Sequence, residues 1–128
     1  MSLISSFLNN RVHDDRPWGS FDRFTHNESS TVKIIRVDAG KRLSLQKHAH
    51  RAEFWRVIEG SGVATVEDEH REVKAGDEVE IPLGALHRLA GGEQGIAVLE
   101  IALGSFDEND IERVEDDFGR GTPASPSA

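Results

Sequence analysis

Residue types that bind metals gather in one short stretch of this chain. Residues 46–53 read QKHAHRAE, so that His48 and His50 lie between a glutamine and a glutamate. Imidazole nitrogens, carboxylate oxygens and amide oxygens together form typical ligand sets for divalent transition metals. A further histidine, His87, follows the segment IPLGAL, in which a proline and a glycine indicate a tight turn. These side chains either hold a metal ion or form an ordinary polar end of a strand.

Strand alternation restricts which of these side chains can share a face. If residues 43–48 form a β-strand, Gln46 and His48 point to one side, and His50 extends the row if the strand continues. Glu53 belongs to the next strand, and a hairpin would bring it beside Gln46 and His48. Polar groups inside a barrel are costly unless something satisfies them, and a cation is one such partner. The remaining ligand would then come from a distant segment.

The elements that would position these residues are short β-strands. Between residues 31 and 103, runs rich in β-branched and aromatic residues are separated by turns, two of which are indicated by the glycines at 60–62 and 91–95. Such a pattern predicts an all-β sandwich or barrel rather than alternating strands and helices. Residues 107–120, DENDIERVEDDFGR, carry apolar residues at roughly helical spacing, which predicts a short C-terminal helix or turn packed on the barrel.

The chain has 128 residues, which fits one compact domain. We expect a lead segment at 1–15, a barrel domain at 16–120 and a disordered tail at 121–128, because the last residues are small, polar and proline-containing. The first residues lack the basic region and apolar core of a signal peptide. No apolar run is long enough to cross a membrane.

Charge and cysteine content exclude several classes of function. The formal net charge of −8 argues against binding to a nucleic-acid backbone or an anionic membrane. The chain has no cysteine, which excludes disulfides, thiolate metal sites and a cysteine nucleophile. The expected compartment is a reducing cytoplasm.

The spacing of the candidate ligands resembles both halves of the cupin double-stranded β-helix, an all-β jelly-roll barrel. The resemblance implies one divalent metal ion (Zn, Mn, Fe, Co or Ni), held by four side chains: Gln46, His48, Glu53 and His87. Gln46 stands where the first histidine of the family usually stands. His50 is left out of the ligand set because fewer residues separate it from Glu53 in the sequence than the family's usual spacing has.

Several separated motifs resemble, more closely, the C-terminal isomerase domain of type II mannose-6-phosphate isomerases. They are RPWGSF at 16–21, LSLQKHAHRAEFW at 43–55, IPLGALHR at 81–88, DIERVEDDFGR at 110–120, and Lys33. The resemblance implies interconversion of mannose 6-phosphate and fructose 6-phosphate, with a divalent cation as Lewis acid. In that family this cupin commonly follows a mannose-1-phosphate guanylyltransferase domain. Here we expect a free-standing isomerase domain without nucleotide-sugar activity.

A sugar phosphate also requires cationic groups and a group that moves a proton. Arg51 and Arg88 are candidates for phosphate binding, and the alternative for both is a structural salt bridge. Strand alternation points Arg88 away from the metal ligands. For the acid/base role His50 is the first candidate, because imidazole titrates near neutrality. Lys33 and a metal-bound water are the alternatives, and His50 is equally compatible with a purely supporting role.

The face opposite the ligands predicts a surface for association. It would carry four apolar side chains: Leu43, Leu45, Phe54 and Ile58. Since an uncovered apolar sheet face promotes association, either the N-terminal segment or a second subunit should cover it, and we favour a homodimer.

Three functions are compatible with the sequence. The first is the sugar-phosphate isomerase, which we favour. The second is a non-catalytic sugar-binding or accessory cupin that needs a partner with transferase activity. The third is another metal-dependent cupin enzyme such as an oxygenase, since two histidines and one carboxylate also fit non-haem iron.

Overall fold

The computed structural model describes residues 8–120, and in this range the chain forms strands, turns and loops without any helix. The predicted tail at 121–128 and the start of the predicted lead segment, 1–7, lie outside the described residues. The strands, in chain order, are β1 (Val12–Arg16), β2 (Gly19–Arg23), β3 (Ser30–Val37), β4 (Leu45–Lys47), β5 (Arg51–Val66), β6 (Glu69–Lys74), β7 (Glu78–Ile81), β8 (His87–Gly104) and β9 (Glu112–Glu115). The boundary predicted between residues 15 and 16 falls inside β1.

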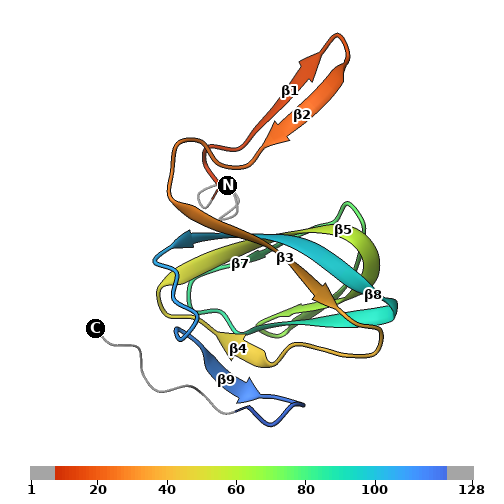
Figure 1. Ribbon diagram of the computed structural model, residues 1–128, viewed down its shortest axis with the longest axis vertical. Helices are drawn as coiled ribbons and strands as arrows, with labels where there is room; N and C mark the ends of the chain where they lie inside the picture. Colours follow the sequence, from red (N-terminus) through yellow and green to blue (C-terminus); the bar gives the residue numbers. More distant parts are fainter. Residues whose placement is uncertain (1–7, 121–128) are drawn as a thin grey trace.

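Two long antiparallel strands, β5 and β8, hold the barrel together. Residues 51–57 of β5 pair with residues 98–104 of β8, and residues 62–66 pair with residues 87–91. Two register shifts separate these stretches, and both strands curl round one end of the barrel there (Figure 1). β6 and β7 pair with β5, whereas β3 and β4 pair with β8, so that all main strands attach to this one pair.

Glycines allow the two strands to bend while they remain in contact. A Cβ atom at Gly62 would lie 2.0 Å from the carbonyl oxygen of Ala90, and one at Gly60 would lie 2.2 Å from that of Gly95. Gly60 also has a positive φ of 76°, which most other residues avoid. The predicted turns at 60–62 and 91–95 are therefore bends inside continuous strands, because a backbone approach this close leaves no room for a side chain.

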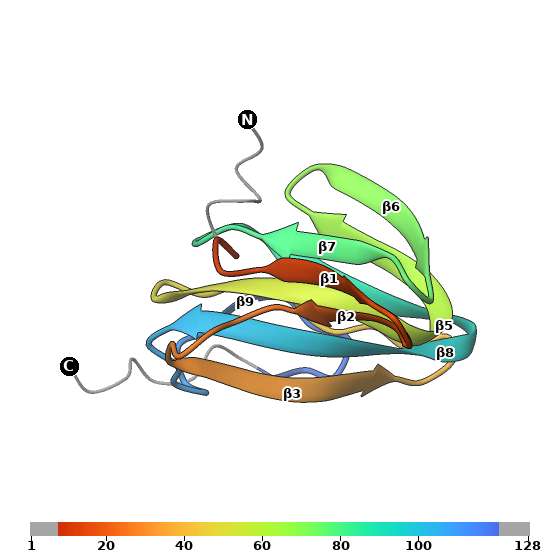
Figure 2. The same cartoon turned by 90° about the horizontal axis from the view of Figure 1, so that it is seen from above.

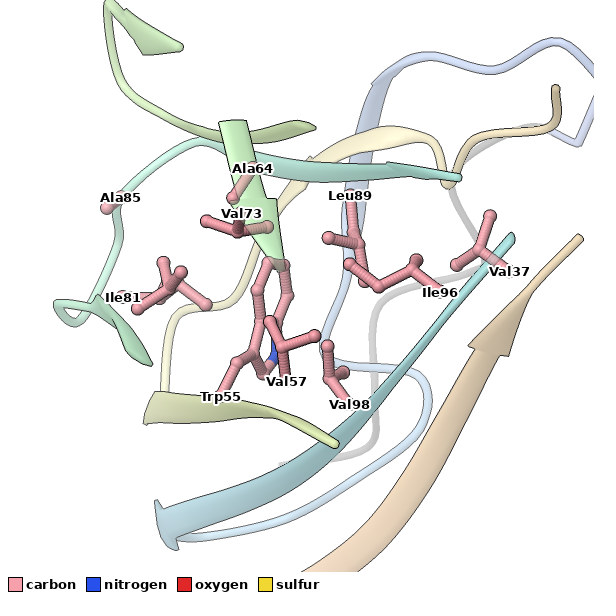
Figure 3. Close-up of a cluster of buried hydrophobic side chains, with 11 residues drawn as sticks. Val37, Trp55, Val57, Ala64, Val73, Ile81, Ala85, Leu89, Ile96 and Val98 are labelled. Atoms are coloured by element: carbon pink, nitrogen blue, oxygen red, sulfur yellow. The ribbon is translucent and has the colours of Figure 1, made fainter. Parts of the chain in front are cut away.

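The inner faces of the strands enclose an apolar core (Figure 3). Trp55 and Val57 project into it from β5, and Leu89 and Val98 project from β8. The predicted alternation along β5 is confirmed on this side, because Trp55 and Val57 share the inner face with buried Glu53.

The N-terminal segment covers the outer face of β5. Phe54 points away from the inner core and is fully buried against Leu8, Phe24 and Ile101. Of the two predicted covers for this face, the N-terminal segment is the one that covers Phe54. The favoured homodimer stays a prediction. Leu43 was expected on the same outer face but packs against the inner core, because the residues before β4 do not form a regular strand.

The C-terminal segment forms a strand where a helix was one of the two predicted alternatives. β9 pairs antiparallel with β4, and turns lie on either side of it at 108–109 and 117–118. The helical spacing was misleading because Val114 and Phe118 are exposed and do not form a buried helix face. The edge of β4 supplies backbone hydrogen-bond partners for this segment instead. Of the two predicted alternatives, the helix is therefore wrong, and the turns are present on either side of β9.

β1 and β2 form a separate two-stranded sheet, which projects from the barrel (Figure 1) and overlies the barrel strands in the view from above (Figure 2). We call Val12–Arg23 the N-terminal arm. Its base is fixed, because Arg11 makes two hydrogen bonds of 2.7 Å to the carboxylate of Glu78 in β7.

Across residues 8–120, the chain has no helix of the length and hydropathy needed to span a membrane.

Replacement of Phe54 tests the covering role of the N-terminal segment. Phe54→Ala should lower the free energy of unfolding by about 3–5 kcal/mol, since it leaves a cavity between two buried layers. Ile58→Ala, at an exposed position further along β5, should cost less than about 1 kcal/mol. Denaturant unfolding measures both. Equal small losses would mean that the outer face of β5 is open in solution.

Candidate metal centre

Three buried side chains from different parts of the chain meet inside the barrel. His48 directly follows β4, Glu53 lies in β5 and His87 is the first residue of β8. One ligand atom from each, an imidazole nitrogen or a carboxylate oxygen, lies within 4.8 Å of the other two. All three side chains are buried. We call these three residues the ligand group.

Backbone carbonyl groups orient both histidines. Nδ1 of His48 lies 2.7 Å from the carbonyl oxygen of Asp110, and Nδ1 of His87 lies 2.9 Å from that of Ala85. A carbonyl oxygen only accepts hydrogen bonds, so each ring donates from Nδ1 and turns Nε2 toward the ligand group. Burial lowers the pKa of His48, which favours the neutral ring that a metal requires.

Two atoms of the ligand group lack a hydrogen-bond partner. Oε1 of Glu53 and Nε2 of His87 are 3.2 Å apart and buried, yet neither is satisfied. With the ring proton on Nδ1, two lone pairs face each other, which is costly in a buried site. A cation between them removes that cost. The donor set of two imidazoles and one carboxylate therefore fits a divalent transition metal.

Arg51 supplies positive charge beside the ligand group. It is buried, and its Nε donates to Oε2 of Glu53 at 3.0 Å while a terminal nitrogen lies 3.3 Å from Nε2 of His48. Its guanidinium carbon stands 4.2 Å from the ring centre of Phe106. Burial raises the pKa of Glu53, but His87, His48 and Arg51 outweigh burial and lower that pKa to about 2. The carboxylate is therefore charged at neutral pH.

Gln46 lies next to the ligand group. It is the direct cross-strand partner of His87 in the pairing of β4 with β8, and cross-strand partners point to the same side of a sheet. The hydroxyl of Ser44 donates to the Gln46 amide oxygen at 2.9 Å, which fixes the orientation of the amide. This placement is compatible with the fourth ligand role, which stays a prediction.

His50 lies outside the ligand group. Its side chain is exposed, and its Nδ1 is 3.5 Å from a carboxylate oxygen of Asp110. The same carboxylate accepts the backbone N–H groups of Ala49 and His50, both at 2.9 Å. Asp110 thereby fixes the turn between β4 and β5 and, through its carbonyl, the ring of His48. These contacts favour a supporting position for His50.

Arg88 is held on the other side of its strand, as alternation predicts. Its Nε donates to the carbonyl oxygen of Leu43 at 2.9 Å, and a terminal nitrogen pairs with Glu115 at 2.6 Å. Arg88 therefore ties β8 to the segment before β4 and to β9. These contacts favour the structural salt bridge over phosphate binding.

Lys33 faces a buried carboxylate that the sequence analysis missed. Its Nζ lies 3.7 Å from Oε1 of Glu100, its partner across β3 and β8, and 3.4 Å from Glu108. Glu100 is buried, Trp55 donates to its Oε2 at 3.0 Å, and its Oε1 has no hydrogen-bond partner. Burial, and then the charge of Glu53, raises the pKa of Glu100 to about 7. The signal was present, since Glu100 is the one charged residue in the run IAVLEIAL.

A surface pocket of about 340 Å³ lies apart from the predicted ligands. It is lined by Arg36, Val37, Asp38, Lys41, Arg42, Leu43, Phe118 and Arg120. Acidic groups already pair with two of its cations, because Arg42 binds Asp117 and Arg120 binds Asp116. We assign it no ligand.

Comparison with known sequences points to one family. Residues 6–116 match the family model described as "Mannose-6-phosphate isomerase C-terminal". The chain is 42% identical to the alginate biosynthesis protein AlgA of Pseudomonas aeruginosa over 107 residues, which cover 82% of this chain and 22% of that protein. It is 39% identical over 107 residues to the mannose-1-phosphate guanylyltransferase ManC of Salmonella typhimurium, with the same coverage of 82% and 22%. The chain thus spans less than a quarter of the length of these relatives.

Comparison with solved structures confirms the fold. A cupin-2 domain protein from Rhodospirillum rubrum superposes with a TM-score of 0.58 at 24% identity, over 67% of this chain and 59% of that one. The capsular polysaccharide assembling protein CapF of Staphylococcus aureus gives a TM-score of 0.59 at 22% identity, over 82% and 34%. The predicted all-β cupin barrel is therefore confirmed.

Substitution of single ligands tests the metal centre. His87→Ala should weaken Zn²⁺ or Mn²⁺ binding on the order of 100-fold or more, because it removes a ligand of a small set. Gln46→Ala should cost less, about tenfold, since a neutral amide oxygen is a weaker ligand. Calorimetric titration of metal into the stripped protein measures both.

His70→Ala is the matched control, because His70 is an exposed histidine on β6 whose ring is hydrogen-bonded to Thr65 and which lies outside the ligand group. It should bind metal as the unsubstituted chain does. Unchanged affinity in His87→Ala would rule out the ligand group as the metal site.

The raised pKa of Glu100 predicts a pH dependence of stability in the metal-free protein. The folded state keeps the Glu100 proton up to about pH 7, whereas the unfolded chain releases it near the ordinary value of 4.5, so stability falls as pH rises between these values. Glu100→Gln should remove that loss, on the order of 1–3 kcal/mol between about pH 5 and about pH 8. Denaturant unfolding at several pH values measures it, with exposed Glu112→Gln as control. A slope that Glu100→Gln leaves unchanged would assign the loss to other groups.

Proposed function

The chain belongs to the family of mannose-6-phosphate isomerase C-terminal domains, and from this premise we propose that it is a metal-dependent isomerase that interconverts mannose 6-phosphate and fructose 6-phosphate. The proposal includes one divalent ion held by the ligand group, with Gln46 as a further ligand. It also includes a cytoplasmic location, where sugar phosphates are metabolised. Because the chain spans 22% of the length of ManC, the guanylyltransferase activity in that relative's name is not part of the proposal.

One observation carries the proposal more than any other. The ligand group contains two buried atoms, Oε1 of Glu53 and Nε2 of His87, that face each other without a hydrogen-bond partner. A cation between these two atoms would satisfy both, and a second unpartnered carboxylate oxygen, that of Glu100, lies within the same interior. A metal site with an additional carboxylate and a lysine beside it can supply the proton acceptor and the charge stabilisation that an aldose–ketose isomerisation uses.

The isomerisation moves a proton between C1 and C2 of the open-chain sugar. When bound, the divalent cation supplies Lewis acidity, which stabilises negative charge on the sugar oxygens. Glu100, in the carboxylate form, accepts the proton from C2 of mannose 6-phosphate and returns it to C1, while the hydroxyl proton moves from O2 to O1, so that no net proton is gained or lost. Lys33, which lies 3.7 Å from Glu100, donates a hydrogen bond to a sugar oxygen and stabilises the charged form of Glu100.

Arg51 contributes positive charge at the proposed site. Its contacts with Glu53 and His48 offset the carboxylate charge, so that the site with a divalent ion has a positive balance that attracts an anionic sugar phosphate. Direct phosphate binding by Arg51 would require release of one of these contacts. Glu100 takes the acid/base role for which His50 was the first candidate and Lys33 an alternative, and Arg88 has no part in the proposal.

Two other functions fit part of the same observations. The ligand group by itself is a set of two histidines and one carboxylate, which also suits non-haem iron in an oxygenase. A sugar-binding cupin without turnover is the other alternative, since the chain matches only the C-terminal part of longer relatives. Iron-dependent oxygen uptake would favour the first, and binding of mannose 6-phosphate without conversion would favour the second.

A direct assay tests the isomerase. The chain loaded in turn with Zn²⁺, Mn²⁺, Fe²⁺, Co²⁺ or Ni²⁺ should convert mannose 6-phosphate to fructose 6-phosphate, and chelation should abolish this. Glu100→Gln should lower kcat by about 10²–10⁴-fold with a small change in KM, as expected for loss of a proton-transfer group.

Glu108→Gln is the matched control, because Glu108 also contacts Lys33 but is exposed. It should keep kcat within a few-fold of the unsubstituted chain. No turnover with any of the five metals would reject the isomerase. The metal centre is tested separately by the metal titration of the His87→Ala variant. Full activity in Glu100→Gln would reject the role of Glu100 alone.

A further inference from the structure

The guanidinium of Arg51 uses all three of its nitrogens at the ligand group. Its Nε donates to Oε2 of Glu53 at 3.0 Å, and one terminal nitrogen donates to the carbonyl oxygen of Asp107 at 3.1 Å. The other terminal nitrogen lies 3.3 Å from Nε2 of His48. The ring of Phe106 covers one side of the guanidinium, with its centre 4.2 Å from the guanidinium carbon. A buried and permanently charged group is therefore bonded directly to two members of the ligand group.

The contact between Arg51 and His48 has a defined direction. Nδ1 of His48 lies 2.7 Å from the carbonyl oxygen of Asp110 and carries the ring proton, because a carbonyl oxygen cannot donate. Nε2 is then the acceptor, and the terminal nitrogen of Arg51 is the donor. The single lone pair on Nε2 can accept a hydrogen bond or bind a metal ion, but it cannot do both. The hydrogen bond from Arg51 and the ligand role of His48 therefore exclude each other.

The hydrogen bond between Arg51 and Glu53 is compatible with a metal ion. Arg51 uses Oε2 of that carboxylate, whereas the unpartnered Oε1 faces Nε2 of His87 at 3.2 Å. The two carboxylate oxygens thus serve different partners. At 3.3 Å, the contact with His48 is also the longest of the three that Arg51 makes, so its loss costs the least.

We propose that Arg51 is a built-in competitor of the metal ion, because its terminal nitrogen takes the lone pair of His48 that the ion needs. Metal loading breaks this one hydrogen bond, and the bonds to Glu53 and Asp107 persist. The inference rests on the proposed metal centre and adds how that centre is regulated. In the chain stripped of metal, Arg51 offsets the buried carboxylate charge and holds the imidazole, so the barrel stays folded when it loses its ion. Each ion that binds must replace the same contact, so Arg51 lowers the affinity for every metal.

Metal titration of Arg51 variants distinguishes a competitor from a support. Arg51→Met should bind Zn²⁺ more tightly than the unsubstituted chain, on the order of tenfold or more, because no charge-assisted hydrogen bond has to be broken. Loss of a residue that only supports the ligands would weaken Zn²⁺ binding instead. Arg51→Lys keeps the charge but not the planar fork that reaches both Glu53 and His48. It should also bind Zn²⁺ more tightly, whereas charge repulsion alone predicts unchanged affinity.

Arg88→Met is the matched control for the titration. Arg88 is also a buried arginine, but it donates to the carbonyl oxygen of Leu43 and to Glu115, away from the ligand group. Its replacement should leave the Zn²⁺ affinity within a few-fold of the unsubstituted chain. Circular dichroism confirms that each variant is folded.

Nuclear magnetic resonance of the unsubstituted chain provides a second test, which does not depend on the folding of any variant. In the chelated protein, the terminal N–H group of Arg51 that donates to His48 should exchange slowly with water. Zn²⁺ should speed up this exchange and shift the ¹⁵N resonance of Nε2 of His48. The Nε–H group of Arg51, bonded to Glu53, should stay protected in both states.

The outcomes separate this inference from the metal centre on which it rests. Weaker or unchanged Zn²⁺ binding in Arg51→Met overturns the inference alone, and so does unchanged affinity in Arg51→Lys. A terminal N–H group of Arg51 that Zn²⁺ leaves protected also overturns it. Absence of metal binding in the unsubstituted chain would instead reject the metal centre, and this inference with it.

Discussion

The structure depends on how the barrel compensates the buried carboxylate of Glu53. An ionised carboxylate inside a β-barrel is costly unless opposite charge or hydrogen-bond donors surround it. Arg51 offsets one oxygen, and the other faces His87 without a hydrogen bond. These partners come from β5 itself and from the start of β8, which the long β5–β8 pairing brings together. Closure of the barrel therefore also brings together the groups that neutralise this charge, and the resulting cluster is one that could hold a metal ion.

The segment after β8 supports the centre from outside the barrel strands. The carbonyl oxygen of Asp110 accepts a hydrogen bond from Nδ1 of His48, and the Asp110 carboxylate accepts two backbone N–H groups of the turn before β5. The carbonyl of Asp107 accepts a hydrogen bond from Arg51 at 3.1 Å, and Phe106 lies against the same guanidinium. A side chain can bind a metal only when its lone pair points toward the ion. Here residues 106–110, far along the chain, orient His48 and Arg51. The acidic C-terminal stretch is thus part of the site.

The N-terminal segment has two physically different parts. Leu8 and Phe24 pack on Phe54 and close the outer side of β5, so the barrel is covered there by its own chain. The arm between Leu8 and Phe24 leaves the barrel and keeps its apolar tip in water. Of the outer face that was predicted to need a cover, Phe54 is covered by the N-terminal segment, whereas Ile58 is exposed.

The sequence was enough to predict the strand pattern and the candidate ligand types, because period-two alternation and side-chain chemistry are local properties of the chain. The choice of His48, Glu53 and His87 among those candidates, with Gln46, came from the resemblance of their spacing to the cupin family. Strand alternation also placed Arg88 on the face away from His87. Tertiary structure alone decided the rest. Glu100 lies near Glu53 and Lys33 because of its position on β8, and residues 112–115 became a strand because β4 offered a free edge. Such outcomes depend on which distant groups become neighbours, and no local pattern encodes the charge, burial or backbone partners that a neighbour supplies.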